Sequence, residues 1–325
     1  MARKARIEYE NAYYHVINRG NFRSWIFETA GARKSFLECL MLTCVAKNWL
    51  LHGWCLMGNH YHLLIQTPDG NLIDGMRWLQ STFANRFNRF RGVNGHVFQG
   101  RYKAILLDMD AIGPVAHYIH LNPVRAGLVG ADQLESFESS SFHQLWFKKK
   151  RWSFGVFECC LDAAGGLADT PKGRRLYRDY LNWLTIEEGE QKRLGFESMC
   201  KGWAKGTKDF KRAVMEDTED SILKQVVESE TKEMREPYWE RILARSLSVL
   251  DKTGSDLKSD RKGAPWKVTL ARYLRESSLI PNAWLAESLH MGTPNSLSSQ
   301  ISRQRKLRQP NGSLWTKLKN QENVD

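Results

Sequence analysis

Two histidines with strand-like neighbours offer the first sign of chemistry in this sequence. His60 and His62 flank Tyr61 in a short apolar run. Side chains two positions apart on a strand point to the same face, so both imidazoles would converge and form half of a divalent-metal site. A His-x-His pair also arises by chance or inside a core, and the other ligands must decide between these interpretations.

A tyrosine and an asparagine further along the chain have the spacing needed to join the histidines. Tyr118 and Asn122 are four residues apart in an expected helix and therefore share one face. An amide oxygen suits Mg²⁺ or Mn²⁺, so Asn122 would complete the metal site and Tyr118 would lie one turn away. A phenol with an ordinary pKa of about 10 is a poor nucleophile, and a metal that polarises a phosphate helps it. The alternatives are an aromatic anchor for Tyr118 and a helix C-terminal cap for Asn122, just before Pro123.

The elements that must position these residues follow from hydrophobic periodicity. Period-two or aromatic runs predict strands, and apolar residues at helical spacing predict helices. The expected strands are 12–18, 50–57, 61–67 and 102–107, and the expected helices are about 30–47, 72–90 and 114–121. This α+β order, β-α-β-β-α-β-α, matches a ferredoxin-like split βαβ antiparallel sheet in its first six elements. The two crossover helices would cover one face and leave the other for a ligand.

Composition indicates a soluble protein with a polyanionic partner. The chain has 325 residues, 42% of them hydrophobic, which suits two or three domains with real cores. Lys and Arg outnumber Asp and Glu by 48 to 36, and the excess lies in residues 1–150 and 261–308. Basic clusters gain from counterion release on nucleic acid, although an ordinary basic protein is the alternative. The six cysteines form no Cys-x-x-Cys motif, and no signal or membrane-spanning stretch is apparent, so we expect a cytoplasmic, nucleoid-associated protein.

The predicted domains are a catalytic region at 1–150, a mostly helical spacer at 151–260 and a helix-turn-helix-like domain at 261–325. Three helices are expected in the last region, at 266–276, 281–290 and 294–306, and the third would read DNA. A capping helical hairpin with a solvated face is the alternative. Its candidate DNA contacts are Ser296, Ser299, Gln300, Arg303 and Arg305. Those of the first region are Arg86, Arg89, Arg91, Arg101, Lys103 and Arg125, with Phe98 or Trp78 as base-stacking candidates.

Three segments resemble a known family. Gly58–Ile65 (GNHYHLLI) resembles the histidine–hydrophobic–histidine motif of the HUH endonucleases. Tyr118–Leu128 (YIHLNPVRAGL) looks like the tyrosine helix of the REP-associated tyrosine transposases, and Gly95–Lys103 (GHVFQGRYK) is similar to their run into the fourth strand. The resemblance covers roughly residues 7–145. Tyr61 is bulkier than the aliphatic residue often found between the two histidines.

The resemblance implies a specific reaction. His60 and His62 would bind Mg²⁺ or Mn²⁺, with Asn122 as the third ligand. Tyr118 would attack a phosphodiester of single-stranded, hairpin-forming repeat DNA and leave a 5′-phosphotyrosine link and a free 3′ hydroxyl. The protein would act as a monomer or homodimer.

The same residues also allow competing hypotheses. Tyr13, Tyr14 and Tyr102 compete for the nucleophile role, but none has a ligand-type residue at helical spacing. A DNA-binding regulator acting through its C-terminal helices would treat the motif residues as coincidence. A metallohydrolase would use the histidine pair with activated water.

Overall fold

The chain folds into two compact units. The computed structural model describes residues 6–229, 232–278, 280–306 and 312–320. The first unit comprises Met1–Ile222 and the second Leu223–Asp325. The predicted boundaries at 150 and 260 therefore do not coincide with the division between these units, because residues 151–222 fold together with the N-terminal region.

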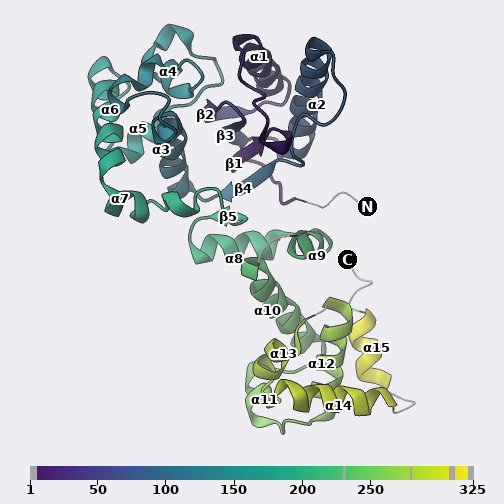
Figure 1. The fold of residues 1–325 in the computed structure, drawn as a ribbon. Coiled ribbons are helices and arrows are strands. Elements are labelled where there is room, and N and C mark those ends of the chain that lie inside the picture. Colours follow the sequence, from purple (N-terminus) through teal and green to yellow (C-terminus); the bar gives the residue numbers. More distant parts are fainter. Residues whose placement is uncertain (1–5, 230–231, 279, 307–311, 321–325) are drawn as a thin grey trace. The chain divides into compact units, whose positions relative to one another are not determined.

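The first unit is built on a mixed sheet with the strand order β2-β3-β1-β4-β5 (Figure 1). Neighbouring strands are antiparallel from β2 to β4, and the short β5 pairs with β4 in parallel. Because β3 lies between β2 and β1, the connection through the first helix skips a strand. The predicted strands agree within one residue with β1 (Ala12–Arg19), β2 (Leu50–Leu56), β3 (His60–Thr67) and β4 (Lys103–Leu107); β5 (Ala204–Lys205) was not predicted.

One face of the sheet is covered by α1 (Ala30–Ala46) and α2 (Leu72–Arg91), which lie side by side in Figure 1. An aromatic cluster fills the space beneath them, with Phe36 against Tyr61 at 4.9 Å between ring centroids. Tyr61 is fully buried and its hydroxyl accepts a hydrogen bond from Gln80 on α2. The residue between the two histidines therefore anchors the sheet to this helical layer and directs its neighbours to the opposite face.

The opposite face is covered as well, which corrects the expectation of a face left for a ligand. Leu64 and Ile105 pack there against Val115 and Ile119 of α3 (Met109–Arg125). This apolar strand face buries its side chains against α3 because both surfaces would otherwise expose hydrocarbon to water.

The bounds of α3 exceed the predicted 114–121. Asp108 caps the helix by accepting from the Met109 N–H, so the helix begins more than a turn before Pro114. It also continues past Pro123, because the Ala126 N–H bonds to the Asn122 carbonyl and closes the last turn.

Residues 131–205 pack onto α3 and the sheet and are not a spacer. Gly113 permits this packing, because a Cβ there would lie 2.2 Å from the Cβ of Ala163. The helical elements of residues 131–217 are η2 (Ala131–Ser136), α4 (Ser141–Trp146), η3 (Lys148–Lys150), α5 (Glu158–Ala163), α6 (Pro171–Ile186), α7 (Glu188–Arg193), η4 (Phe196–Ser198) and α8 (Lys208–Asp217).

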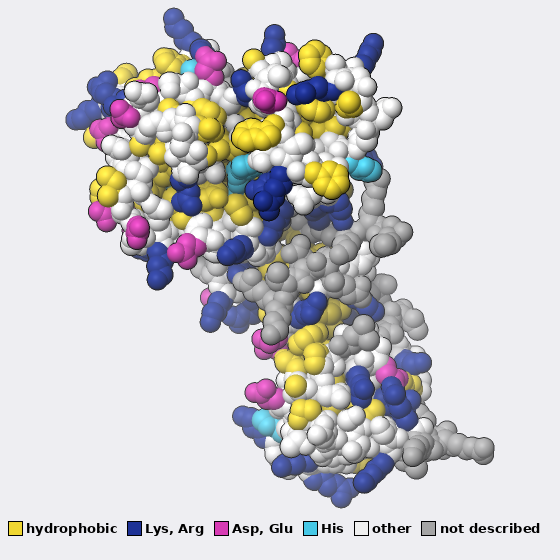
Figure 2. Space-filling view, viewed as in Figure 1, with side chains coloured by type: hydrophobic (Ala, Val, Ile, Leu, Met, Phe, Trp, Pro, Cys, Tyr) yellow, Lys and Arg dark blue, Asp and Glu magenta, His cyan; other side chains and the backbone are white. Residues whose placement is uncertain are grey.

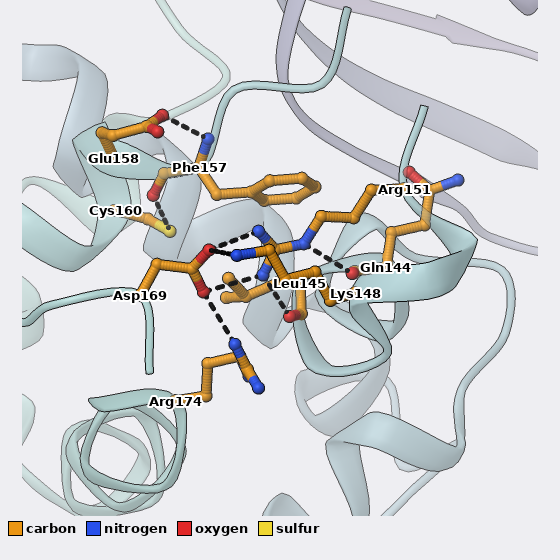
Figure 3. Close-up of polar contacts among 9 residues, drawn as sticks. All are labelled: Gln144, Leu145, Lys148, Arg151, Phe157, Glu158, Cys160, Asp169 and Arg174. Atoms are coloured by element: carbon orange, nitrogen blue, oxygen red, sulfur yellow. Dashed lines mark hydrogen bonds and ion pairs between the residues drawn. The ribbon is translucent and has the colours of Figure 1, made fainter. Parts of the chain in front are cut away.

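A partly buried ion-pair network links these elements across the predicted boundary at 150 (Figure 3). The Arg151 guanidinium donates to both carboxylate oxygens of Asp169, at 2.5 and 2.9 Å, and to the carbonyls of Gln144 and Leu145. Arg174 on α6 donates to the same carboxylate at 2.9 Å. The Arg151 hydrogen bond holds the pKa of Asp169 well below its ordinary value, since it favours the charged form.

The second unit is helical. Its apolar core includes Leu270, Leu274, Leu285, Leu297 and Ile301. The three helices predicted here are all present, and the third has the predicted bounds, 294–306. The elements are α9 (Asp220–Ser229), α10 (Lys232–Val249), α11 (Gly254–Ser259), α12 (Pro265–Ser278), α13 (Asn282–Ser288), α14 (Pro294–Lys306) and α15 (Gly312–Asn320). Among the described residues, no helix has the length and apolar character to cross a membrane.

Candidate active site

The two histidines of β3 lie on the face that α3 covers. His60 is the first residue of the strand, and the ring centroid of His62 is 5.1 Å from its own. His62 is 3% exposed, whereas His60 is half-buried. The pair therefore lies at the border of the face that α3 covers, with His60 partly open to solvent and His62 buried.

A chain of hydrogen bonds fixes the proton of His62. The Nδ1 atom of His15 on β1 is 3.3 Å from the carbonyl oxygen of Met199, which can only accept, so Nδ1 carries the proton. Burial lowers the pKa of His15 to about 3, so this ring is neutral and its Nε2 is an acceptor. That Nε2 lies 2.9 Å from Nδ1 of His62, which must donate. The Nε2 of His62 is left with a free lone pair.

A second hydrogen bond sets the same arrangement at His60. Its Nδ1 lies 2.7 Å from the side-chain oxygen of Asn59, and with Nδ1 protonated the Nε2 lone pair is also available. Burial, and secondarily the charge of Arg19, lowers the pKa of His60 to about 4. Burial lowers the pKa of His62 well below its ordinary value, and the neighbouring His15 and His60 add to this effect. Two neutral imidazoles, each with its other nitrogen hydrogen-bonded, are the donors that a divalent metal requires.

Tyr118 projects from α3 toward the same spot. Its ring meets that of His62 edge-on at 5.8 Å and that of His15 at 6.1 Å. The hydroxyl lies 3.3 Å from the sulfur of Cys200. Burial and the Cys200 contact raise the pKa of Tyr118, while the Arg125 guanidinium, 5.3 Å from the ring centroid, opposes this. The nucleophile candidate and the histidine pair are therefore neighbours.

The side chain of Asn122 is hydrogen-bonded within its own helix. Its amide nitrogen donates to the Tyr118 carbonyl at 3.0 Å, and among the described residues no hydrogen bond joins it to either His60 or His62. The part of the chain that the structure describes also holds no group of three His, Cys, Asp or Glu side chains placed to bind a metal. A third protein ligand therefore stays a prediction.

The segment from Phe196 to Lys205 completes the site, and no sequence motif indicated it. Phe196 packs edge-on against Tyr118 at 5.5 Å, Met199 supplies the carbonyl for His15, and Cys200 meets the Tyr118 hydroxyl. The Lys103 ammonium donates to the Cys200 carbonyl at 3.0 Å, and β5 holds the segment against β4. These contacts join residues far apart in the sequence, and no local pattern marks them.

The competing tyrosines differ from Tyr118 in their surroundings. Tyr14 and Tyr102 are 1% and 6% exposed, so neither hydroxyl is open to a large substrate. Tyr13 is half-buried on β1, and its ring lies 5.2 Å from that of His52. Within the described part of the chain, Tyr118 is the tyrosine whose ring contacts that of His62.

Two of the six cations predicted to bind DNA in the first unit lie at the site. Arg125 stands over the Tyr118 ring, and Lys103 binds the segment beside it. The others, which are Arg86, Arg89, Arg91 and Arg101, are exposed, and Arg86 forms an ion pair with Glu38 at 3.4 Å. Of the stacking candidates, Phe98 is wrong, because it is 8% exposed and packs against Tyr61, while Trp78 is 38% exposed.

The C-terminal candidates share one helix. Ser296, Ser299 and Arg303 are exposed on α14, whose opposite side buries Leu297 and Ile301. Thr293 caps the helix by accepting from the Ser296 N–H. The remaining two candidates make contacts of their own: Gln300 donates to the Ser296 hydroxyl at 3.3 Å, and Arg305 donates to Glu276 of α12 at 2.6 Å.

Comparison with known proteins finds a family model that matches part of the first unit. Residues 8–122 match the family model described as "Transposase IS200 like". A solved structure described as "Structure of the REP associates tyrosine transposase bound to a REP hairpin" is similar at 17% identity and a TM-score of 0.38, over 47% of this chain and 90% of that one. No curated protein matches the chain. The matched region spans both histidines, Tyr118 and Asn122.

Proposed function

We propose, from the match of residues 8–122 to the IS200-like transposase family, that this protein cuts and rejoins single-stranded DNA through a covalent bond to Tyr118. The observation that carries the proposal is the contact between the Tyr118 ring and His62, with Arg125 over the same ring. A nucleophile, a pair of metal-binding nitrogens and a cation that lie together in this way suit attack on a phosphodiester.

The reaction exchanges one phosphodiester for another. The phenol oxygen of Tyr118 bonds to phosphorus, the bond to the 3′ oxygen breaks, the phenol proton passes to water and the departing oxygen takes up a proton. The product is a 5′-phosphotyrosine and a free 3′ hydroxyl, and attack by a 3′ hydroxyl reverses the step. Arg125 favours the charged form of the phenol, against the effect of burial.

The histidine pair fits a divalent metal. His60 and His62 would hold Mg²⁺ or Mn²⁺ through their Nε2 atoms, and Asn122 is the proposed third ligand. Such an ion, when bound, supplies positive charge to the phosphate under attack. Asn59 and His15 would accept hydrogen bonds from the Nδ1–H groups of His60 and His62. These bonds would hold the proton on Nδ1 and leave Nε2 unprotonated for the metal.

The fold and the substrate class belong to the same proposal. The order β2-β3-β1-β4 with helices α1 and α2 on one face supports a ferredoxin-like assignment. The motif resemblance points to hairpin-forming repeat DNA as the substrate. The exposed residues of α14 support DNA binding by a helix-turn-helix, a role that would also suit a regulator without catalysis.

A covalent adduct tests the proposal. Incubation of the full chain with Mn²⁺ and a labelled stem-loop oligonucleotide should give a protein–DNA species that survives SDS. Tyr118→Phe should abolish the adduct, whereas Tyr180→Phe, on α6 and half-buried, should retain it. Equal cleavage by wild type and Tyr118→Phe would refute tyrosine catalysis, and tight duplex binding without cleavage would favour the regulator.

A further inference from the structure

The loop after β1 exposes two aromatic side chains beside the candidate active site. Phe22 is 93% exposed and Trp25 is 63% exposed, in a loop that follows the central strand β1 and is hydrogen-bonded to the turn before β3. Single exposed aromatics are common, but two within four residues form a patch that calls for a partner.

The backbone holds this loop in one shape. Phe22 and Arg23, in η1 (Asn21–Arg23), have φ values of 50° and 60°, a left-handed conformation that costs non-glycine residues energy. Hydrogen bonds fix the loop at both ends: the Gly20 N–H bonds to the Asn59 carbonyl and the Phe27 N–H to the Gly58 carbonyl. The outward position of Phe22 is therefore imposed by the fold, and strain of this kind concentrates at functional sites.

Two contacts tie the loop to the metal-ligand candidate His60. The Asn59 side chain accepts from His60 Nδ1 through its oxygen and donates to the Arg23 carbonyl through its nitrogen, at 3.3 Å. The Trp25 ring lies against Gly58, where a Cβ would stand 2.2 Å from the ring. Only glycine allows this approach, so the indole is held against the residue two positions before His60.

The charges around the loop suit a nucleic-acid strand. Arg19 and Arg23 are exposed, and the sequence from Arg19 to Phe27 contains no acidic residue. Trp25 also borders a cavity of about 950 Å³, which leaves room beside the indole and whose lining carries both charges, from Arg33 and Lys34 and from Glu28, Glu38 and Glu138. In the view of Figure 2, hydrophobic, histidine and Lys or Arg side chains lie next to one another near the middle of the N-terminal unit.

We propose that Phe22 and Trp25 form a stacking platform for unpaired DNA bases next to the phosphate that Tyr118 attacks, with Arg19 and Arg23 binding the backbone. Bases stack on aromatic rings regardless of sequence, and the adjacent arginines bind phosphates. This inference rests on the proposed function for the position of the strand, but it concerns binding and not bond cleavage.

DNA binding by a variant that cannot cleave its probe tests the platform. In a Tyr118→Phe background, we compare a stem-loop carrying a thymine-rich single-stranded flank with the same stem-loop without a flank, by fluorescence anisotropy. Phe22→Ala and Trp25→Ala should each weaken binding of the flanked probe by about 5- to 150-fold, from the usual contribution of one stacked base. Binding of the blunt probe should not change. Trp25→Phe should restore most of the affinity.

Matched controls show whether the loss of affinity is specific to the platform. Trp183→Ala, an exposed tryptophan on α6 at 46%, should bind both probes as wild type does. A 2-aminopurine in the flank should be quenched on binding, and Trp25→Ala should remove the quenching. Equal losses for both probes, no loss for either, or a change in oligomeric state caused by the substitutions would overturn the platform. If the protein with Tyr118 intact forms no adduct on any probe but the flank-dependent loss of affinity persists, the proposed cleavage fails and the platform stands.

Discussion

His15 is hydrogen-bonded to the metal-ligand candidate His62 but is not itself a proposed ligand, so its substitution tests the outer support of the metal site. His15→Leu keeps a similar buried volume and removes the acceptor for the Nδ1 proton of His62. The imidazole of His62 can then shift its proton to Nε2, the nitrogen that must be unprotonated to bind a metal. Loss of such an outer hydrogen bond typically costs about 10- to 100-fold in metal affinity, or about 1.4 to 2.8 kcal/mol.

Titration of the DNA-free protein with Mn²⁺, followed by electron paramagnetic resonance, measures this loss without reference to activity. His15→Gln is the matched variant, because its side-chain oxygen can accept from His62, and it should recover part of the affinity. Urea unfolding separates folding from binding, since an unpaired buried N–H costs about 1–3 kcal/mol on its own. Wild-type Mn²⁺ affinity in a folded His15→Leu protein would refute the reasoning.

Three further outcomes follow from contacts outside the histidine pair. Asp169→Asn should lower the free energy of unfolding by about 2 kcal/mol at pH 7, measured by urea titration. The folded state depresses the pKa of Asp169, so this difference from wild type should shrink as the pH falls below about 4. Asp179→Asn, whose carboxylate is 64% exposed, should cost little, and an equal loss would contradict the network. Alkylation of Cys200 should block DNA cleavage, because the added group would crowd the Tyr118 hydroxyl. The cleavage activity of Cys200→Ser should therefore survive the reagent, whereas that of Cys159→Ser should still be lost. Arg303→Ala should weaken DNA binding yet leave adduct formation at saturating DNA unchanged, and unaltered affinity would favour a capping role for α14.

Local patterns were enough to predict the strand that carries the two histidines, but not the full extent of the helix that carries Tyr118 and Asn122. Period-two runs located β1 to β4 within one residue, because each strand alternates between two helical layers or buries both faces. The helix α14 has the predicted bounds because Thr293 and Pro294 supply a cap and a first-turn residue that any helix would use. The predicted start of α3 is wrong because Asp108 caps the helix more than a turn before Pro114.

The surroundings of the site depend on contacts that sequence periodicity does not encode. His15 appears in the sequence as one more residue of an apolar strand, and only the pairing of β1 with β3 brings it to His62. Cys200 and Met199 reach Tyr118 and His15 through a segment that packs back across the sheet edge. The weak local signals of residues 151–222 predict only a spacer, yet Arg151 donates to the carbonyls of Gln144 and Leu145, and Asp169 pairs with Lys148 across the predicted boundary.

The proposed function depends most directly on a bond between the Tyr118 oxygen and DNA. Wild-type protein is incubated with Mn²⁺ and a stem-loop oligonucleotide, the adduct is digested with protease and nuclease, and the nucleotide-bearing peptide is sequenced by mass spectrometry. We expect a 5′-phosphate linkage on Tyr118 alone. A nucleotide on Tyr13, Tyr14 or Tyr102, or cleavage with no modified tyrosine, would contradict tyrosine catalysis at this site.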